Sequence, residues 1–254
     1  MCRDATVLQM DVGNSGLKWR LVNAGHILAR GQLGFDEAGV AQLPVLDSAP
    51  DAVAIASVAA DAMDRQLAVR IRQQWSVRPW FARSAAETLG LRSSYANPET
   101  MGVDRWLAML GAWHPLQERV CVVDVGSALT IDLVAEDGRH EGGYIVPGGT
   151  LMQRALLRDT QRVRFAESLA AGLEPGSSTA EAVSHGAAIA QCGAVAQAMV
   201  LAAAGAGVSP RLLITGGGGG ALARQLGMEA ELRPDLVFEG LQLAAAAAQA
   251  STAG

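Results

Sequence analysis

Short apolar stretches alternate with polar, glycine-containing turns along the chain, a pattern typical of proteins that mix β-strands with α-helices. The first apolar stretch, 7–12, is followed by a Gly-Asn-Ser-Gly turn, and the next two, 17–22 and 27–33, alternate apolar and polar residues. This pattern predicts three consecutive strands joined by short turns. We therefore expect a three-stranded meander with a polar loop at its first corner.

A similar arrangement recurs in the second half of the chain. Asp124 ends an apolar stretch over 119–124 as Asp11 lies at the end of the first one, and Gly138 stands in the turn position that Gly25 occupies earlier. Two such meanders could coincide by chance. The shared turn position nevertheless favours an internal duplication.

Other apolar periodicities predict the elements between and after these meanders. We expect strands at 52–58, 77–81, 130–134, 140–145 and 212–215, and helices at 61–74, 103–114, 178–204 and 238–249. Pro115 is expected to stop the second helix, because proline cannot donate the backbone hydrogen bond that continues a helix. Strands that alternate with helices in each half predict an α/β fold with two domains, 1–116 and 117–254.

Composition narrows the range of functions. The formal net charge of −5 and the absence of a dense Lys/Arg stretch make a nucleic-acid ligand unexpected. Cys2, Cys121 and Cys192 lie far apart, which predicts reduced, buried thiols and neither disulfides nor a thiolate metal site. The four histidines are scattered without ligand spacing. The first residues include charges in place of an apolar run, so we expect a cytoplasmic protein without a membrane segment.

The loop after the first strand combines groups that bind phosphate. It consists of Asp11, Val12, Gly13, Asn14, Ser15, Gly16, Leu17 and Lys18. Backbone N–H groups of a glycine turn can surround phosphate oxygens, and a carboxylate can hold Mg²⁺ or its waters. The spacing matches neither the P-loop nor the dinucleotide-binding fingerprint. Taken alone, the same residues are also compatible with an ordinary turn.

Two further loops show related chemistry. Asp124-Val125-Gly126-Ser127-Ala128 repeats the first loop, and two such loops facing each other would hold a triphosphate from both sides. Thr215 precedes a run of five glycines, 216–220, where bare backbone could approach a phosphate or a flat nucleoside. A flexible surface loop is the alternative for the glycine run.

Four motifs, in this order, resemble those of the type III pantothenate kinases, bacterial enzymes that start coenzyme A synthesis. They are Asp11-Val12-Gly13-Asn14-Ser15, the segment from Tyr95 to Arg105 (Y-x-x-P-x-x-M-G-x-D-R), Asp124-Val125-Gly126-Ser127-Ala128, and Gly142-Gly143-Tyr144-Ile145-Val146-Pro147-Gly148. The resemblance covers nearly the whole chain. It implies the fold of the actin, sugar kinase and Hsp70 superfamily: two duplicated actin-like (ribonuclease H-like) domains, each a mixed sheet flanked by helices, with an ATP cleft between them.

The resemblance also implies roles for residues of the substrate segment. Asp104 would be the general base that takes the proton from the pantothenate hydroxyl; otherwise it is an acid stabilised by a helix N-terminus. Further substrate contacts are implied for Tyr95, Gly102, Val103, Arg105 and Thr179. Thr179 would reach the pocket at a homodimer interface, and a simple helix N-cap is its alternative.

Cofactor sites follow from the same resemblance. Residues 11–18 would bind the ATP phosphates, with Asp11 as the Mg²⁺ partner, and Asp124 would bind a monovalent cation, K⁺ or NH₄⁺. Ser127 stands where the family usually has a threonine that contacts ATP, and Leu129 is a second departure. Domain 1–116 would carry the first phosphate loop and the substrate segment, and domain 117–254 the second phosphate loop, the glycine-rich adenosine loop and the dimer helices.

These observations lead us to expect ATP-dependent phosphorylation of pantothenate to 4′-phosphopantothenate. Two alternatives remain at this point. One is a kinase of the same superfamily that acts on another small-molecule acceptor, such as a sugar or a carboxylate. The other is a nucleotide-binding regulatory relative without kinase activity, which the departures at Ser127 and Leu129 would explain.

Overall fold

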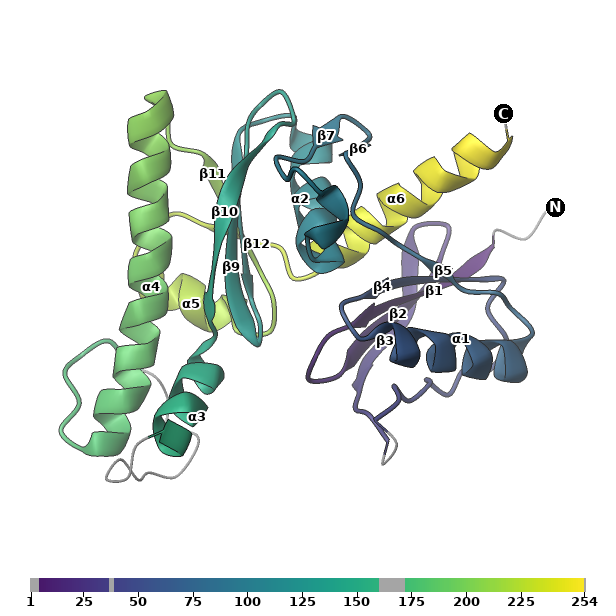
Figure 1. Cartoon of the computed structure of the whole chain (residues 1–254), viewed down its shortest axis with the longest axis horizontal. Helices are drawn as coiled ribbons and strands as arrows, with labels where there is room; N and C mark the ends of the chain where they lie inside the picture. Colours follow the sequence, from purple (N-terminus) through teal and green to yellow (C-terminus); the bar gives the residue numbers. More distant parts are fainter. Residues whose placement is uncertain (1–4, 37–38, 160–171, 254) are drawn as a thin grey trace. The chain divides into compact units, whose positions relative to one another are not determined.

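The computed structural model describes residues 5–36, 39–159 and 172–253 of the chain (Figure 1). The chain divides into two compact units, Met1–Gly111 with Leu236–Gly254, and Ala112–Asp235. Each unit is built around one five-stranded sheet. We describe each unit by itself.

The first unit contains a mixed sheet with strand order β3-β2-β1-β4-β5. Its strands are β1 (Thr6–Val12), β2 (Leu17–Asn23), β3 (His26–Leu33), β4 (Ala52–Ser57) and β5 (Trp80–Phe81). β1 runs antiparallel to β2 and parallel to β4. The helix α1 (Asp61–Trp75) buries Leu67 and Ile71 in a core with Leu8 and Met10 of β1. Alternate residues of β1 thus form the core on one face of the sheet.

The first unit also contains α6 (Leu236–Ala253) and the part of α2 (Val103–Leu116) up to Gly111. The helix α6 contacts β1 and β4, and α2 crosses α6 where both helices carry glycine. A Cβ on Gly111 would lie 2.9 Å from the backbone N of Gly240, and a Cβ on Gly240 would overlap the carbonyl oxygen of Leu107. Glycine is needed at this crossing because the two backbones touch.

The second unit repeats the topology of the first. Its strand order is β10-β9-β8-β11-β12, with β8 antiparallel to β9 and parallel to β11. The strands are β8 (Val120–Val125), β9 (Ala128–Val134), β10 (His140–Pro147), β11 (Arg211–Thr215) and β12 (Glu231–Leu232). The meander turns also match, since Gly25 and Gly138 have φ values of 80° and 82°. The predicted duplication of mixed sheets flanked by helices is confirmed.

Three helices accompany the second sheet: α3 (Gly149–Asp159), the long α4 (Thr179–Ala206) and α5 (Gly219–Leu226). α4 lies alongside the sheet in Figure 1 and packs Val195 and Met199 into a core with Val123 and Ile131. Among the described residues, α4 is the one helix long and apolar enough to cross a membrane by length and composition. Its packing against β9, α3 and α5 is that of a helix belonging to a folded unit.

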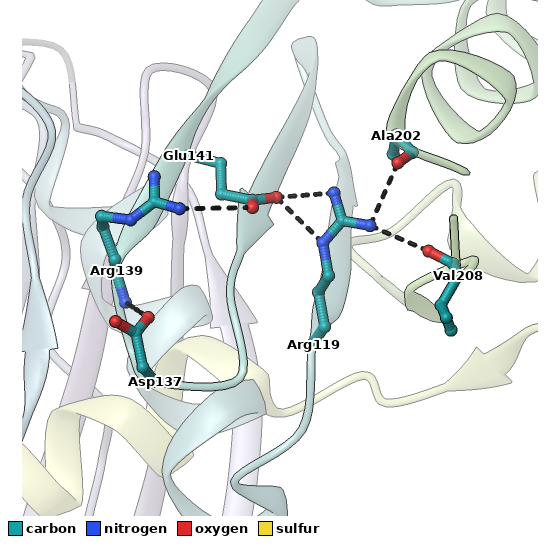
Figure 2. A network of polar contacts seen from close by, with 6 residues as sticks. All are labelled: Arg119, Asp137, Arg139, Glu141, Ala202 and Val208. Atoms are coloured by element: carbon teal, nitrogen blue, oxygen red, sulfur yellow. Dashed lines mark hydrogen bonds and ion pairs between the residues drawn. The ribbon is translucent and has the colours of Figure 1, made fainter. Parts of the chain in front are cut away.

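Arg119 ties the end of α4 to the sheet (Figure 2). Its Nη1 donates to the carbonyl oxygens of Ala202 (3.1 Å) and Val208 (2.9 Å), while Nε and Nη2 donate to Glu141 Oε2 at 3.0 and 2.8 Å. Arg119 directly precedes β8, so these hydrogen bonds link the C-terminal end of α4 to β8 and, through Glu141, to β10.

Several predicted elements differ from the structure. Pro115 does not stop α2 but lies in its last turn, where the Gln117 N–H still donates to the Trp113 carbonyl at 2.8 Å. The strand predicted over 77–81 is reduced to β5. The helix predicted over 238–249 was assigned to the second half, whereas α6 belongs to the first compact unit. The sequence pattern also missed α3 and the short pair β6 (Glu87–Thr88) and β7 (Leu91–Arg92).

The prediction of reduced, buried thiols is confirmed for two of the three cysteines. Cys121 and Cys192 are free and buried, and Cys2 lies outside the described residues. Burial, with a smaller contribution from Asp132, raises the pKa of the Cys121 thiol to about 12. This thiol is therefore protonated and unreactive at neutral pH.

Candidate active site

The first phosphate loop is a tight hairpin between β1 and β2. Asp11 and Lys18 are direct cross-strand partners, so their side chains lie on the same face of the hairpin. The Gly13 N–H donates to the Gly16 carbonyl at 2.9 Å and closes the turn, which leaves Asn14 and Ser15 exposed at its tip. Gly16 has a φ of 155°, and a Cβ there would lie 2.9 Å from the Leu33 carbonyl oxygen. The hairpin thus presents a carboxylate, an amine and exposed polar groups together.

A buried serine supports the edge of the sheet beside this loop. Ser57, the last residue of β4, is the register partner of Val12, and the Val58 N–H donates to the Val12 carbonyl at 3.1 Å. The Ser57 hydroxyl donates to Asp64 Oδ1 at 2.6 Å, and both residues are buried. This link connects the end of β4 to α1 next to the loop.

The substrate segment leads into α2 and is held by a second buried serine. The Ser84 hydroxyl donates to the Met101 carbonyl at 2.9 Å. Asp104 lies in the first turn of α2, and its Oδ1 accepts a hydrogen bond from the Arg105 N–H at 2.8 Å. A Cβ on Gly102 would lie 2.6 Å from the same Asp104 oxygen. The glycine of the G-x-D-R motif therefore makes room for the aspartate carboxylate.

Tyr95 and Arg105, which the sequence placed in one substrate site, are in direct contact. Arg105 Nη1 donates to the Tyr95 hydroxyl oxygen at 2.9 Å, and the guanidinium carbon lies 5.8 Å from the centre of the tyrosine ring. Arg105 is buried, as is the neighbouring Val103. The predicted substrate residues on the segment before α2 and on its first turn thus form one cluster.

The second phosphate loop is tighter than the first. The Gly126 N–H donates to the Ala128 carbonyl at 2.9 Å, and Ser127 is exposed. Gly148, which ends the G-G-Y-I-V-P-G motif, donates its N–H to the Ser127 carbonyl at 3.0 Å. A Cβ on Gly148 would lie 2.5 Å from the Gly126 carbonyl oxygen and 2.6 Å from that of Ser127. Only glycine allows this approach.

The glycine run packs against the same loop. Gly216 has a φ of 85°, and a Cβ there would overlap the Asp124 carboxylate and lie 2.5 Å from the Val125 carbonyl oxygen. The Gly218 N–H donates to that carbonyl at 3.0 Å, and α5 begins at Gly219. Three segments that the sequence singled out thus meet around Asp124. The alternative of an unattached surface loop is wrong for this part of the run.

The donor sets suit a nucleotide with its metal. Bare glycine backbone beside each strand-end aspartate leaves room for a phosphate or a nucleoside. Among the described residues, no group of three or more His, Cys, Asp or Glu side chains could hold a metal ion. Mg²⁺ fits nonetheless, because it commonly binds through one or two carboxylates together with substrate phosphates and water.

Thr179 is exposed and is the first residue of α4. The interpretation of Thr179 as an N-cap is wrong, because Ser178 takes that position and its hydroxyl accepts from the Glu181 N–H at 3.2 Å. Glu181 Oε2 in turn accepts from the Ser177 hydroxyl and N–H, both at 2.7 Å. These hydrogen bonds from Ser177 are the main cause of the lowered pKa of Glu181. The reciprocal cap fixes the segment that carries Thr179.

Comparison with known sequences identifies the family. The sequence profile of the type III pantothenate kinases matches residues 7–200. The type III pantothenate kinase of Pseudomonas aeruginosa is 38% identical over 244 residues, covering 94% of this chain and 98% of that protein. That of Halorhodospira halophila is 38% identical over 246 residues, covering 92% and 95%. This chain belongs to the type III pantothenate kinase family.

Solved structures agree on the fold. A protein described as a conserved putative Baf family transcriptional activator from Campylobacter jejuni has a TM-score of 0.60 at 21% identity and covers 96% of this chain and 99% of its own. MreB5 of Spiroplasma citri, bound to AMPPNP, has a TM-score of 0.52 at 8% identity, covering 98% of each chain. The expected actin-like architecture is thereby confirmed. Membership of the pantothenate kinase family implies ATP and a divalent metal.

Two buried serines of the site were missed by sequence reasoning. Ser57 links the end of β4 to α1 beside the first phosphate loop and Ser84 holds the substrate segment, yet neither belongs to one of the four motifs. The available signal was weak: Ser57 lies near the end of the strand predicted over 52–58, and Ser84 lies three residues after the strand predicted over 77–81. Glycines such as Gly148, by contrast, were already part of a motif.

Proposed function

We propose that this protein transfers the γ-phosphoryl group of ATP to the hydroxyl of pantothenate, giving 4′-phosphopantothenate in the first step of coenzyme A synthesis. The observation that carries the proposal is the cluster at the start of α2. There Arg105 contacts Tyr95, and Gly102 leaves space for the Asp104 carboxylate. Family membership supports pantothenate as the acceptor.

Asp104 acts as the general base in this proposal. Its carboxylate lies in the first turn of α2. The carboxylate accepts the hydroxyl proton of pantothenate while that oxygen bonds to the γ-phosphorus and the bond to the ADP oxygen breaks. Arg105 and Tyr95 bind the acceptor, Gly102 and Val103 line its pocket, and Thr179 contributes from across a dimer interface.

ATP binds through the two aspartate loops. Residues 11–18 hold its phosphates, Asp11 holds Mg²⁺, and Ser127 contacts the nucleotide from the second loop. The metal would neutralise charge on the phosphates. Asp124 binds K⁺ or NH₄⁺, and the glycine run beside it takes the adenosine. The close packing of Gly216 and Gly148 around the second loop supports the assignment of the cation and the adenosine to this region.

The protein forms a homodimer in the cytoplasm, with no nucleic-acid or membrane partner. α4 supports the dimer because it leaves Ile189, Val200 and Leu201 exposed, and apolar surface of this kind is usually covered by a partner. Covering α4 by a second copy would also place Thr179 at an interface.

The decisive experiment is a phosphorylation assay with purified protein, ATP, Mg²⁺ and pantothenate, run in K⁺ and then in Na⁺. We expect 4′-phosphopantothenate in K⁺ buffer and a much lower rate in Na⁺. Replacing Asp104 with Asn should lower kcat by about 10²- to 10⁴-fold with little change in stability. No product in K⁺, or an unchanged rate for Asp104→Asn, would contradict the proposal.

The alternatives predict different outcomes. A carboxylate acceptor is already ionised at neutral pH, so Asp104→Asn would leave kcat nearly intact. A regulatory relative would bind nucleotide without turnover. The departure at Leu129 gives little support to this alternative. The Leu129 side chain is fully buried in the core of the second unit and therefore does not face a ligand. Ser127 keeps an exposed hydroxyl at its position.

A further inference from the structure

We propose that the first unit contains a second ligand site, which binds a small organic anion with an apolar body. The site is a cavity of about 710 Å³ between the sheet and the second half of α6. This volume lies within the range of small-molecule sites in proteins. Residues of β1, β4, α6 and the segment between α1 and β5 line it, among them Val7, Gln9, Ala54, Arg78, Trp80 and Ala245.

The cavity lies away from the first phosphate loop. Val7, near the start of β1, lines it, whereas Asp11 lies near the other end of the strand. Four residues of strand separate the two positions by about 13 Å. The lining also includes Ala24 and Gly25, which form the turn at the opposite end of β2 from the phosphate loop. A ligand here would not occupy the phosphate loop.

The cavity exists because small side chains face each other across it. β4 presents Ala52 and Ala54, and α6 presents Ala245 and Ala246. The first turns of α6 pack against the first unit through the buried residues Leu236, Phe238 and Leu241. The alanine side chains that follow are too small to fill the space between α6 and the sheet. Val7 and Trp80 add apolar wall. These surfaces suit an apolar ligand body.

Hydrogen-bond donors at the cavity favour an anionic group on the ligand. Among the described residues, Arg78 takes part in no hydrogen bond or ion pair, and it is exposed at the cavity. Gln9 is buried, and its Oε1 accepts a hydrogen bond from Arg20 Nε at 2.6 Å. The side-chain NH₂ group of Gln9 is therefore the part of the amide that can donate to a ligand. Asp51 also lines the cavity, but its Oδ2 accepts the Thr6 N–H at 2.7 Å. The donors therefore select a carboxylate or a similar anion.

Two probes of the same shape test this site: 1-naphthoate, an anion, and 1-naphthamide, which is neutral. Calorimetry on the full-length protein should show one equivalent of naphthoate binding more tightly than naphthamide. Arg78→Gln should weaken naphthoate binding about 5-fold and leave naphthamide unchanged, because a partly exposed charge pair contributes modestly. Arg72→Gln is the matched control, since this exposed arginine of α1 is not part of the lining.

A filling variant tests the location. Ala245→Phe should abolish binding of both probes and retain the melting temperature; if it is poorly folded, Ala246→Phe fills the cavity from an exposed position. Equal binding of the two probes, no binding of naphthoate, or unchanged binding in a folded filling variant overturns the proposal. The rate of pantothenate phosphorylation with ATP is measured in parallel, and Arg78→Gln should leave this rate unchanged.

Discussion

The two units build similar aspartate loops and support them in different ways. In the first unit, buried serine hydroxyls make the supporting hydrogen bonds: Ser57 bonds Asp64 of α1 beside the phosphate loop, and Ser84 bonds the Met101 carbonyl of the substrate segment. In the second unit, glycine backbones at Gly148 and Gly216 press directly against the loop. Duplication thus preserved the sheet and the strand-end aspartate, while the supports diverged. Substitutions should therefore affect a loop that is supported by side-chain hydrogen bonds differently from a loop that packs against glycine backbone.

The largest effect is expected where backbone supports the second loop. Gly216→Ala introduces a Cβ against Asp124 and Val125 at a φ of 85°. Left-handed backbone and overpacking together should lower the free energy of unfolding by about 2–4 kcal/mol. Chemical denaturation measures the loss, and the KM for ATP should rise in the same variant.

The adjacent residue is a matched control for this effect. A Cβ on Gly217 would have no atom within 4 Å. Gly217→Ala should therefore stay within about 0.5 kcal/mol of the parent protein. If the two alanine variants were equally stable, the tight packing of the glycine run against Asp124 would be refuted.

A hydroxyl support in the first unit should give a smaller loss of stability and a specific loss of rate. Ser84→Ala leaves the buried Met101 carbonyl without its donor, at a cost of about 1–2 kcal/mol. Because Met101 lies just before Gly102 and Asp104, misplacement of the base should lower kcat roughly 10-fold.

The control for this variant is Ser48→Ala, which changes an exposed serine of the same unit and should be silent. Ser84→Thr, which keeps a hydroxyl, should recover part of kcat. An Ser84→Ala enzyme with full kcat and lowered stability would show that the serine is purely structural.

The motif glycines themselves should behave alike in both loops. A Cβ on Gly13 would lie 3.6 Å from its nearest neighbour, and one on Gly126 would lie 3.7 Å from its nearest. Both are ordinary contacts, so Gly13→Ala and Gly126→Ala should change stability by less than about 0.5 kcal/mol. A methyl group would still obstruct phosphate oxygens, so KM for ATP should rise several-fold in both. A change in only one variant would break the proposed equivalence of the loops.

The sequence was sufficient for most strands of the two five-stranded sheets and for both aspartate loops, because strand alternation and local motifs encode them. It was insufficient where non-local packing decides. Pro115 sits in the last turn of α2 because only one helical hydrogen bond is lost there. The place of α6 depends on the crossing of Gly111 and Gly240, which no periodicity reveals. Ser57 and Ser84 act on partners distant in sequence, so their roles appear only in three dimensions.

The smallest expected effect concerns the cap that holds Thr179. The pKa of Glu181 is lowered, chiefly by hydrogen bonds from Ser177, so the ionised carboxylate stabilises the folded state. This contribution is fully present above the ordinary glutamate value of 4.5 and is lost as pH falls through the lower folded-state pKa. The melting temperature of the parent should therefore exceed that of Glu181→Gln slightly at pH 6, and the gap should narrow as the pH falls below 4.5. Thermal melts of both proteins across this range measure it. A gap that stays constant with pH would mean that the cap does not depend on the charge of Glu181.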